Sequence, residues 1–572
     1  MSLRTGVLGT ACFLAVCAPG CRTFWIEPQP TSAIAGLHNR LKSPLAATSY
    51  RPATPGTPEA TLLAASDLAD YAARADRRDS DDAVDAHYGA AMASWTALHG
   101  VDPHSEQFQL AQDAYQASLA RMMITARQAG RFVPGRGLVV QGAYGPIFVP
   151  LVLHSAVWQQ ADVHAIHPVG DYRVSELTRT YRSPGWGVPV VVQRSGAAGR
   201  YPAEEFLSAE SGFAATALLR PTPGGRACLE LYDPLHPAPG ATPPVVPLAY
   251  DISAPFALRL VSSPALRSDW LSFFGVDRPT REGLFFIEPY QPGKIPIVLV
   301  HGVLSNPVAW VDLANDLRAV PGFADRYQLW AFRYATGKPF LESAAFLRRD
   351  LYRAAAAVDP AGCDPAMHQV TLIGHSMGGL VSELQAACSG DRLWNAVANR
   401  PLGAIVASDA SRRALQEMFF FNPQPNVACI ISIAAPHQGS NLAARPIGRL
   451  GSALAQHDPE RVARHAELVR DNPGVFSEEL TRGVPTSIDM LEPESAVLQA
   501  IAALPRSPRV EYHTIFGYGR WSLGQGPGDG VVPIDSALSP WAASQVGVEA
   551  PHTHIHRRLE TAQEILRILS ER

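Results

Sequence analysis

The chain has 572 residues, which is too long for one ordinary hydrophobic core and implies two or three domains. Its 47% hydrophobic and 17% charged residues exclude a wholly disordered protein. The net charge of −4 provides no overall basic field of the kind that indicates nucleic-acid binding.

The first 21 residues have the pattern of an export signal. Arg4 precedes an apolar run at residues 7–18, which is too short to span a bilayer as a helix. The small residues before Cys21 resemble a bacterial lipoprotein signal, in which the cysteine is lipidated, and Cys17 is the competing position. Simple secretion and an uncleaved anchor are the alternatives. We expect an exported protein, either secreted or held in the cell envelope (periplasm or outer membrane) by an N-terminal lipid anchor.

A tether and a helical module are predicted next. Residues 22–57 are rich in Pro, Ser, Thr and Ala without periodicity, which is typical of a tether. Residues 58–131 place apolar and aromatic side chains such as Leu62, Trp95 and Tyr115 at helical spacing. This module resembles a tetratricopeptide-type hairpin that docks a protein partner. The lack of a period repeated three times favours a plain packing module instead.

Residues 132–284 predict a β-rich accessory domain, because short apolar runs alternate with Gly and Pro clusters. Pro189 interrupts one such run, so that strand is expected to start after it or to lie at an edge. His154, His164 and His167 are close in sequence but have no accompanying pattern of Cys or acidic residues. We therefore interpret them as ordinary polar residues and not as metal ligands.

A nucleophile elbow is predicted at residues 370–381. An apolar, β-branched run leads into Gly374-His375-Ser376-Met377-Gly378, and a helix-forming segment follows. Small residues two before and two after the serine allow strand and helix to approach closely at a strained corner. Ser376 is therefore the candidate nucleophile.

A catalytic elbow needs an oxyanion hole. The apolar strand at residues 294–300 runs into His301-Gly302, and the loop that follows is expected to supply one of its two N–H donors. Acyl transfer requires two backbone N–H groups directed at the developing negative charge. One comes from the residue after the nucleophile, Met377, and the other from the loop after the early strand, for which Val303 is the candidate. His301 is interpreted as stabilising this loop.

Apolar strands at residues 327–334 and 427–434 alternate with a helix at 343–358. This alternation predicts an α/β fold with a mostly parallel sheet and flanking helices over residues 285–572. Helical residues at about 441–508 interrupt the pattern and are expected to form a lid insertion or, alternatively, simple packing helices.

The acid and the base are predicted from their order after the serine. Asp529 lies on a Gly-Asp-Gly turn beyond a late strand, and Asp409 and Asp489 are weaker candidates. His552 comes first after the last predicted strand and is the candidate base, with His554 as the alternative.

No metal and no cofactor are expected. His552, His554 and His556 alternate, but no further ligands accompany them. Outside the first 21 residues the four cysteines are scattered, match no zinc site and reveal no disulfide pairing: Cys228, Cys363, Cys388 and Cys429.

Together these motifs resemble the α/β-hydrolase superfamily on its lipase and esterase side, over residues 293–572. The resemblance rests on His301-Gly302, Gly374-His375-Ser376-Met377-Gly378-Gly379, Ala435-Pro436-His437-Gln438-Gly439-Ser440, Gly528-Asp529-Gly530-Val531-Val532-Pro533 and the His552 loop. Two of these motifs, Pro436-His437-Gln438-Gly439-Ser440 and the turn Gly528-Asp529-Gly530, resemble those of triacylglycerol lipases and GPI-inositol deacylases. The resemblance implies a serine hydrolase that cleaves carboxylic esters of lipids or small molecules. An acyltransferase with the same triad and an inert envelope scaffold are the alternatives.

Overall fold

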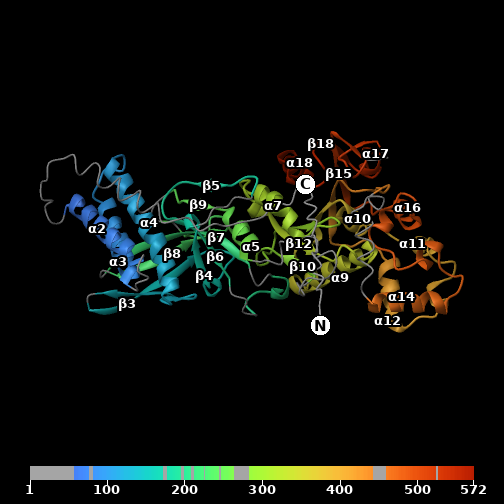
Figure 1. Cartoon of the computed structure of the whole chain (residues 1–572), viewed down its shortest axis with the longest axis horizontal. Coiled ribbons are helices and arrows are strands. Elements are labelled where there is room, and N and C mark those ends of the chain that lie inside the picture. Colours follow the sequence, from blue (N-terminus) through green and yellow to red (C-terminus); the bar gives the residue numbers. More distant parts are fainter. Residues whose placement is uncertain are drawn as a thin grey trace, which may run out of the picture.

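The computed structural model describes residues 57–76, 82–142, 144–171, 177–194, 199–207, 211–223, 226–241, 243, 247–262, 282–441, 459–522 and 526–572. The molecule is elongated, with the N-terminal helices at one end and helices α12 (Asp409–Phe419) and α14 (Pro459–Asp471) at the other (Figure 1). The predicted signal and most of the tether lie outside the described residues. No helix in the described part of the chain combines the length and apolarity needed to cross a bilayer.

Three helices open the described chain: α2 (Pro58–Asp76), α3 (Asp82–Leu98) and α4 (Glu106–Gln128). Ser105 begins α4 as its N-cap, because its hydroxyl accepts a hydrogen bond from the N–H of Phe108 at 3.2 Å. Ala-rich helix faces allow α2, α3 and α4 to pack closely against one another in sequence order.

A seven-stranded sheet follows in the order β1-β2-β3-β8-β7-β6-β4, antiparallel except for the β3–β8 pair. Its strands are β1 (Phe132–Val133), β2 (Gly137–Gly142), β3 (Gly145–His154), β4 (Ala165–Pro168), β6 (Val188–Gln193), β7 (Gly212–Thr222) and β8 (Arg226–Tyr232). Strands β5 (Arg182–Ser183) and β9 (Tyr250–Asp251) pair separately, and helix α5 (Ala254–Ser262) ends the region.

The three helices and this sheet share one hydrophobic core. Trp95 of α3 and Tyr115, Leu119 and Met122 of α4 pack into the same cluster as the sheet residues. The Tyr115 hydroxyl lies between the N–H and the carbonyl of Leu219, at 2.7 and 3.1 Å. The predicted boundary at residue 131 is therefore a change of secondary structure within one body.

Pro189 lies inside β6, so the expectation that the strand starts after it or runs along an edge is wrong. The strand begins at Val188 and lies between β7 and β4. The pairing with β4 ends at Val190, however, so Pro189 has a strand partner only on the β7 side. The missing N–H consequently costs no ladder hydrogen bond.

The C-terminal sheet has the order β10-β12-β11-β13-β14-β15-β18, parallel except for its antiparallel edge strand β10. The strands are β10 (Gly283–Phe286), β11 (Ile295–Val300), β12 (Tyr327–Arg333), β13 (Val370–His375), β14 (Val427–Ile433), β15 (Glu511–Tyr518) and β18 (Ser544–Glu549). The domain boundary predicted between residues 284 and 285 falls inside β10. This four-residue edge strand is too short to be recognised from its pattern.

Helices cover both faces of this sheet. Helices α7 (Val311–Arg318) and α18 (Leu559–Ser570) contribute to one hydrophobic cluster, and α9 (Phe340–Val358) and α10 (Met377–Glu383) contribute to the other. The buried strands β11 and β13 have no exposed residue, as expected for a sheet that is covered on both sides. Short elements complete the domain: α8 (Phe323–Arg326), β16 (Arg520–Ser522), β17 (Gly526–Gly528) and α17 (Ile534–Ala537).

Two insertions extend the domain, where the sequence predicted one. The predicted insertion at about 441–508 contains α14, α15 (Glu478–Thr481) and α16 (Ala496–Ala502), and its residues 442–458 lie outside the described part. A second insertion between α10 and β14 carries α11 (Arg392–Asn395) and α12. Helices α12 and α14 lie together at the end of the molecule (Figure 1). The four cysteines in the described residues are free thiols.

Candidate active site

Ser376 occupies the corner between β13 and α10 with a strained backbone. Its φ of 55° and ψ of −128° lie in a region that L-residues rarely adopt. A Cβ atom at position 374 would lie 2.3 Å from the carbonyl oxygen of Gly378, and one at position 378 would lie 2.2 Å from that of Val300. Both positions therefore require glycine, and the sheet and the elbow helix hold the serine at its corner.

The structure brings the predicted nucleophile, base and acid into one hydrogen-bonded chain. Nε2 of His552 lies 3.0 Å from Oγ of Ser376, and Nδ1 of the same ring lies 2.7 Å from Oδ2 of Asp529. All three residues are buried. Such an arrangement lets an imidazole accept the hydroxyl proton while the carboxylate orients the ring and stabilises its positive charge.

Hydrogen bonds within the turn around Asp529 orient its carboxylate toward His552. Oδ1 accepts hydrogen bonds from the N–H groups of Val531 and Val532, each at 2.8 Å, while Oδ2 is left for His552. Burial alone would raise the pKa of Asp529, but the neighbouring imidazole and these N–H donors outweigh it and lower the pKa. The carboxylate is therefore ionised at neutral pH.

The predicted oxyanion donors come from α10 and from the turn after β11, the strand next to β13. Met377 is the first residue of α10, where helical N–H groups have no partner within the helix. In the turn after β11, the N–H of Leu304 donates to Oγ1 of Thr336 at 3.2 Å, which leaves Val303 as the loop donor. Among the described residues, neither the Val303 nor the Met377 N–H has a hydrogen-bond acceptor. Both groups are thus available to a developing oxyanion.

His301 supports the loop after β11, as the sequence suggested. Its ring stacks on Tyr334 with centroids 4.4 Å apart, and the Tyr334 hydroxyl donates to its backbone carbonyl at 2.6 Å. Burial lowers the pKa of His301 to about 3, so this imidazole is neutral. The contact links the oxyanion loop to the end of β12.

A cluster of tilted and edge-on rings, His375, His556 and Trp310, packs next to the His552 ring. Nε2 of His375 donates a hydrogen bond to the backbone carbonyl of His552 at 2.9 Å, and the two ring centroids lie 4.8 Å apart. His556 lies 4.6 Å from His375 and 5.4 Å from Trp310. Burial, together with the charge of His552, lowers the pKa of His375 to about 3. His556 is buried among these rings, in a short 3₁₀ helix (Ile555–Arg557) that directly precedes α18.

A buried ionic cluster beside the elbow helix was not predicted from the sequence. Glu383 of α10 lies 2.6 Å from Nε2 of His437, 2.9 Å from Oγ of Ser432 and 3.5 Å from Nη2 of Arg506. The Pro-His-Gln-Gly-Ser motif singled out His437, but its partner comes from a distant helix without a pattern of its own. The cluster joins α10 to the loop after β14 and serves the loop structure.

The remaining candidates lie elsewhere. Asp409 starts α12, and Asp489 accepts hydrogen bonds from the N–H and hydroxyl of Thr486. His554 bonds to Oγ1 of Thr553 at 2.9 Å, whereas His552 reaches the serine. Within the described ranges, no three His, Cys, Asp or Glu side chains are grouped so that they could hold a metal ion.

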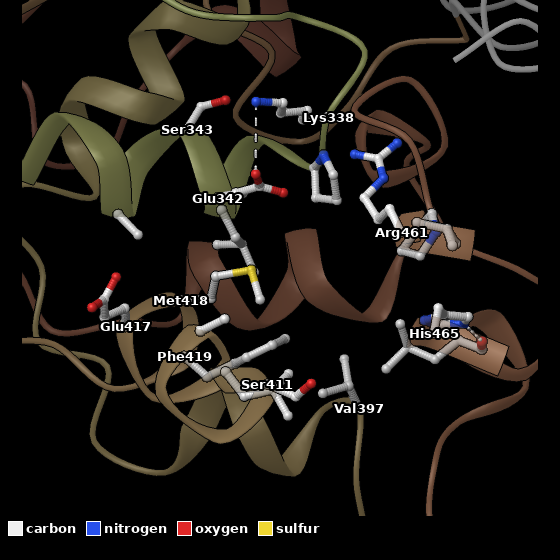
Figure 2. A pocket seen from close by; sticks show the side chains of 18 of the residues that line it. Lys338, Glu342, Ser343, Val397, Ser411, Glu417, Met418, Phe419, Arg461 and His465 are labelled. Carbon is white, nitrogen blue, oxygen red and sulfur yellow. Dashed lines mark hydrogen bonds and ion pairs between the residues drawn. The ribbon is translucent and has the colours of Figure 1, made fainter. Parts of the chain in front are cut away.

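A cavity of about 650 Å³ lies between α9, α12 and α14 (Figure 2). Its lining is mainly apolar and comes from the sheet domain and both insertions, including Tyr334, Ala345, Trp394, Met418, Phe419, Leu468 and Phe476. Polar residues also line it at several places, among them Lys338, Glu342, Glu417, Arg461 and His465 (Figure 2). None of Ser376, Asp529 and His552 lines it. Tyr334 lines the cavity, and its hydroxyl donates to the backbone carbonyl of His301 in front of the loop that carries Val303.

The fold and the strained serine corner define an α/β-hydrolase in the C-terminal half of the chain. Residues 297–567, just under half of the sequence, match the family described as "Alpha/beta hydrolase family". The match agrees with the α/β-hydrolase fold of the C-terminal half, and the N-terminal half lies outside it.

Solved structures with some likeness to the chain include two bacterial lipases and a protein named EstA. Mature lipase BlEst2 of Bacillus licheniformis is 18% identical with a TM-score of 0.31, covering 50% of this chain and 97% of the lipase. Lipase 1 of Pelosinus fermentans is 15% identical with a TM-score of 0.30, covering 49% and 98%. EstA of Clostridium botulinum is 14% identical with a TM-score of 0.29, covering 50% and 89%. No curated protein matches the chain.

Proposed function

We propose that the C-terminal half is a serine hydrolase that cleaves carboxylic esters through an acyl-enzyme. The observation that carries this proposal is the continuous hydrogen-bonded chain from Asp529 through His552 to Ser376 on a strained elbow. A serine in an ordinary structural role needs neither a strained backbone nor a buried imidazole on its hydroxyl.

The proposed reaction has two halves. Nε2 of His552 takes the hydroxyl proton as Oγ of Ser376 bonds to the ester carbonyl carbon, and the carbonyl oxygen becomes an oxyanion. Collapse of this tetrahedral intermediate breaks the bond to the alcohol oxygen, which receives the proton from His552. Water then attacks the acyl-enzyme by the same route and releases the acid.

The surrounding groups stabilise charge in the transition states. The N–H groups of Val303 and Met377 bind the oxyanion, and Asp529 stabilises the imidazolium of His552. None of these steps calls for a cofactor.

The cavity supports an ester with an apolar chain as the substrate class. Its volume lies within the range of small-molecule sites, and its walls are aromatic and aliphatic. Ala345→Phe would place a ring in the cavity, whereas Ala356→Phe adds the same ring on an exposed part of α9. We expect the first variant to lower kcat/KM for long-chain p-nitrophenyl esters about tenfold or more relative to acetate, and the second to leave the ratio unchanged. Equal chain-length profiles would argue against this use of the cavity.

The central test compares Ser376→Ala with Ser570→Ala, a control at the exposed end of α18. We expect Ser376→Ala to lose roughly 10⁴-fold or more of p-nitrophenyl ester hydrolysis and all labelling by a fluorophosphonate probe. Retained turnover in this variant would sink the assignment. A wild-type protein that does not label would favour the inert scaffold, and ester products formed with an added alcohol would favour acyl transfer.

We further propose export with a lipid anchor, on the basis of the charged and apolar pattern of residues 1–21. Expression of the full chain with radioactive palmitate, beside Cys21→Ala and Cys17→Ala variants, tests this proposal. Loss of label in one variant identifies the anchor, and an unlabelled wild type contradicts lipidation.

A further inference from the structure

A short segment of the N-terminal region, residues 177–183, lies against the hydrolase domain next to the loop that carries His552. The guanidinium of Arg179 donates to both carboxylate oxygens of Asp316, with Nε at 2.8 Å from Oδ1. Its Nη2 also donates to the backbone carbonyl of Arg557 at 3.1 Å. One side chain of the N-terminal region thus bridges two separate elements of the hydrolase domain.

Helix α7 presents a polar face to this segment. Asp312, Asn315 and Asp316 are each at most 4% exposed. Asp312 accepts from the N–H of Thr178 at 2.8 Å, and the amide of Asn315 donates to the carbonyl of Arg179 at 2.8 Å. Buried carboxylates on a helix that faces the sheet core need such partners, because an unpaired buried charge is strongly destabilising. The face is therefore built to receive the segment.

The same helix holds the far end of the base loop. Nε of Arg557 lies 2.9 Å from Oδ2 of Asp312, and the Arg557 carbonyl is bound by Arg179. Arg557 ends a short 3₁₀ helix, Ile555–Arg557, which begins three residues after His552. The loop is thus fixed at one end by α7 and by the N-terminal segment.

From this fixed point, packed rings lead back to His552. His556 lies between Trp310 and His375, and His375 contacts both the ring and the carbonyl of His552. A displacement of Arg557 would shift His556 and then His552, whose Nε2 must stay within hydrogen-bond distance of Ser376.

We propose that Arg179 is a positioning residue for His552, so that the N-terminal region completes the active site of the hydrolase domain. This inference rests on the proposed function, since it assigns the accessory region a role in that same reaction. Arg179 touches no reacting atom and acts through Arg557 and Asp316.

Another contact between the two regions provides a matched control. Nη2 of Arg353 on α9 lies 2.6 Å from Oε2 of Glu205, and both side chains are about half exposed. This ion pair also joins the N-terminal region to the hydrolase domain, but it does not involve α7 or the base loop. Glu205→Gln therefore weakens docking of the two regions without touching the loop.

The experiment compares full-length wild type, Arg179→Ala, Arg179→Lys and Glu205→Gln. The measurements are the rate of labelling of Ser376 by a fluorophosphonate, kcat and KM for a p-nitrophenyl ester, and the thermal midpoint. Lysine keeps a positive charge beside Asp316 but cannot donate to Asp316 and Arg557 in the same fork geometry. The Arg179→Lys variant therefore distinguishes a loss of His552 positioning from a loss of folding.

We expect Arg179→Ala to lower the labelling rate and kcat about 10 to 100-fold, with KM within about twofold of wild type. Arg179→Lys should be folded and show an intermediate loss, and Glu205→Gln should react like wild type. If both Arg179 variants react like wild type, the positioning role of Arg179 is wrong, although the proposed function stands. The same holds if Glu205→Gln loses as much labelling rate and kcat as Arg179→Ala. An unreactive wild type would overturn the proposed function and this inference with it.

Discussion

Two buried carboxylates, Asp162 in the N-terminal region and Asp529 in the hydrolase domain, occupy polar clusters of opposite kinds. Asp162 receives the guanidinium groups of Arg194 and Arg200, at 3.0 and 2.8 Å, and the hydroxyl of Tyr201. Asp529 receives two backbone N–H groups and one imidazole, and that imidazole leads to Ser376.

The comparison shows which property of a buried polar cluster indicates a catalytic role. In the Asp162 cluster, charge is neutralised by permanently cationic side chains that cannot exchange protons at ordinary pH. In the Asp529 cluster, the partner of the carboxylate is a group that titrates, and the cluster ends in a hydroxyl on a strained backbone. Burial and pairing are common to both, and only the second has a path for a proton.

The largest effect is expected from a substitution that removes the charge of Asp529 but keeps the size of its side chain next to His552. Asp529→Asn retains the side-chain volume but removes the charge that orients His552 and stabilises its protonated form. We expect kcat to fall by about 10³ to 10⁴-fold with a folded protein. Steady-state kinetics and the thermal midpoint check this result. A loss of less than tenfold would mean that Asp529 does not orient the base.

The corresponding change in the other cluster should act on stability. Asp162→Asn leaves Arg194 and Arg200 without their shared carboxylate in a buried site, and we expect a loss of about 3 to 5 kcal/mol in the free energy of unfolding. Urea unfolding measures this loss. At temperatures where the variant is folded, its rate of Ser376 labelling should match that of wild type. A selective loss of reactivity would contradict a purely structural role for this cluster.

The smallest effect is expected at His437, whose titration should tune stability. Burial opposes its positive charge, but the carboxylate of Glu383 at 2.6 Å outweighs this and raises the pKa of His437. Because the pKa of His437 is higher in the folded state, its protonation stabilises the folded protein. This stabilisation is complete below the unfolded-state pKa of about 6.5 and disappears as pH rises through the folded-state pKa.

The test compares urea unfolding of wild type and His437→Gln across this range. The stability advantage of wild type, on the order of 1 kcal/mol, should be largest near about pH 6 and shrink at alkaline pH. Burial opposes ionisation of Glu383, yet the charge of His437 lowers the pKa of Glu383 to about 2, so the carboxylate stays ionised throughout. An advantage that grows with pH would contradict the direction of the His437 shift.

Much of the candidate site could be predicted because its parts follow local rules. The elbow at Ser376 needs glycines at fixed spacing, and Asp529 and His552 follow in chain order after late strands. The structure places these three side chains within hydrogen-bond distance, and their catalytic role stays a prediction that kinetics must test. The Glu383 cluster could not be predicted, since its members come from α10, a loop and a distant segment that share no pattern.

The sequence by itself determined the α/β-hydrolase fold of the C-terminal half and the serine corner, because strand periodicity and glycine spacing are properties of neighbouring residues. Only the tertiary structure decided that His552 and not His554 faces Ser376. It also decided that the N-terminal helices and sheet share one core, and that Arg179 reaches α7 and the base loop. The contacts of His552 with Ser376 and of Arg179 with Asp316 and Arg557 join residues more than a hundred positions apart, and such long-range packing leaves no periodic trace in the chain.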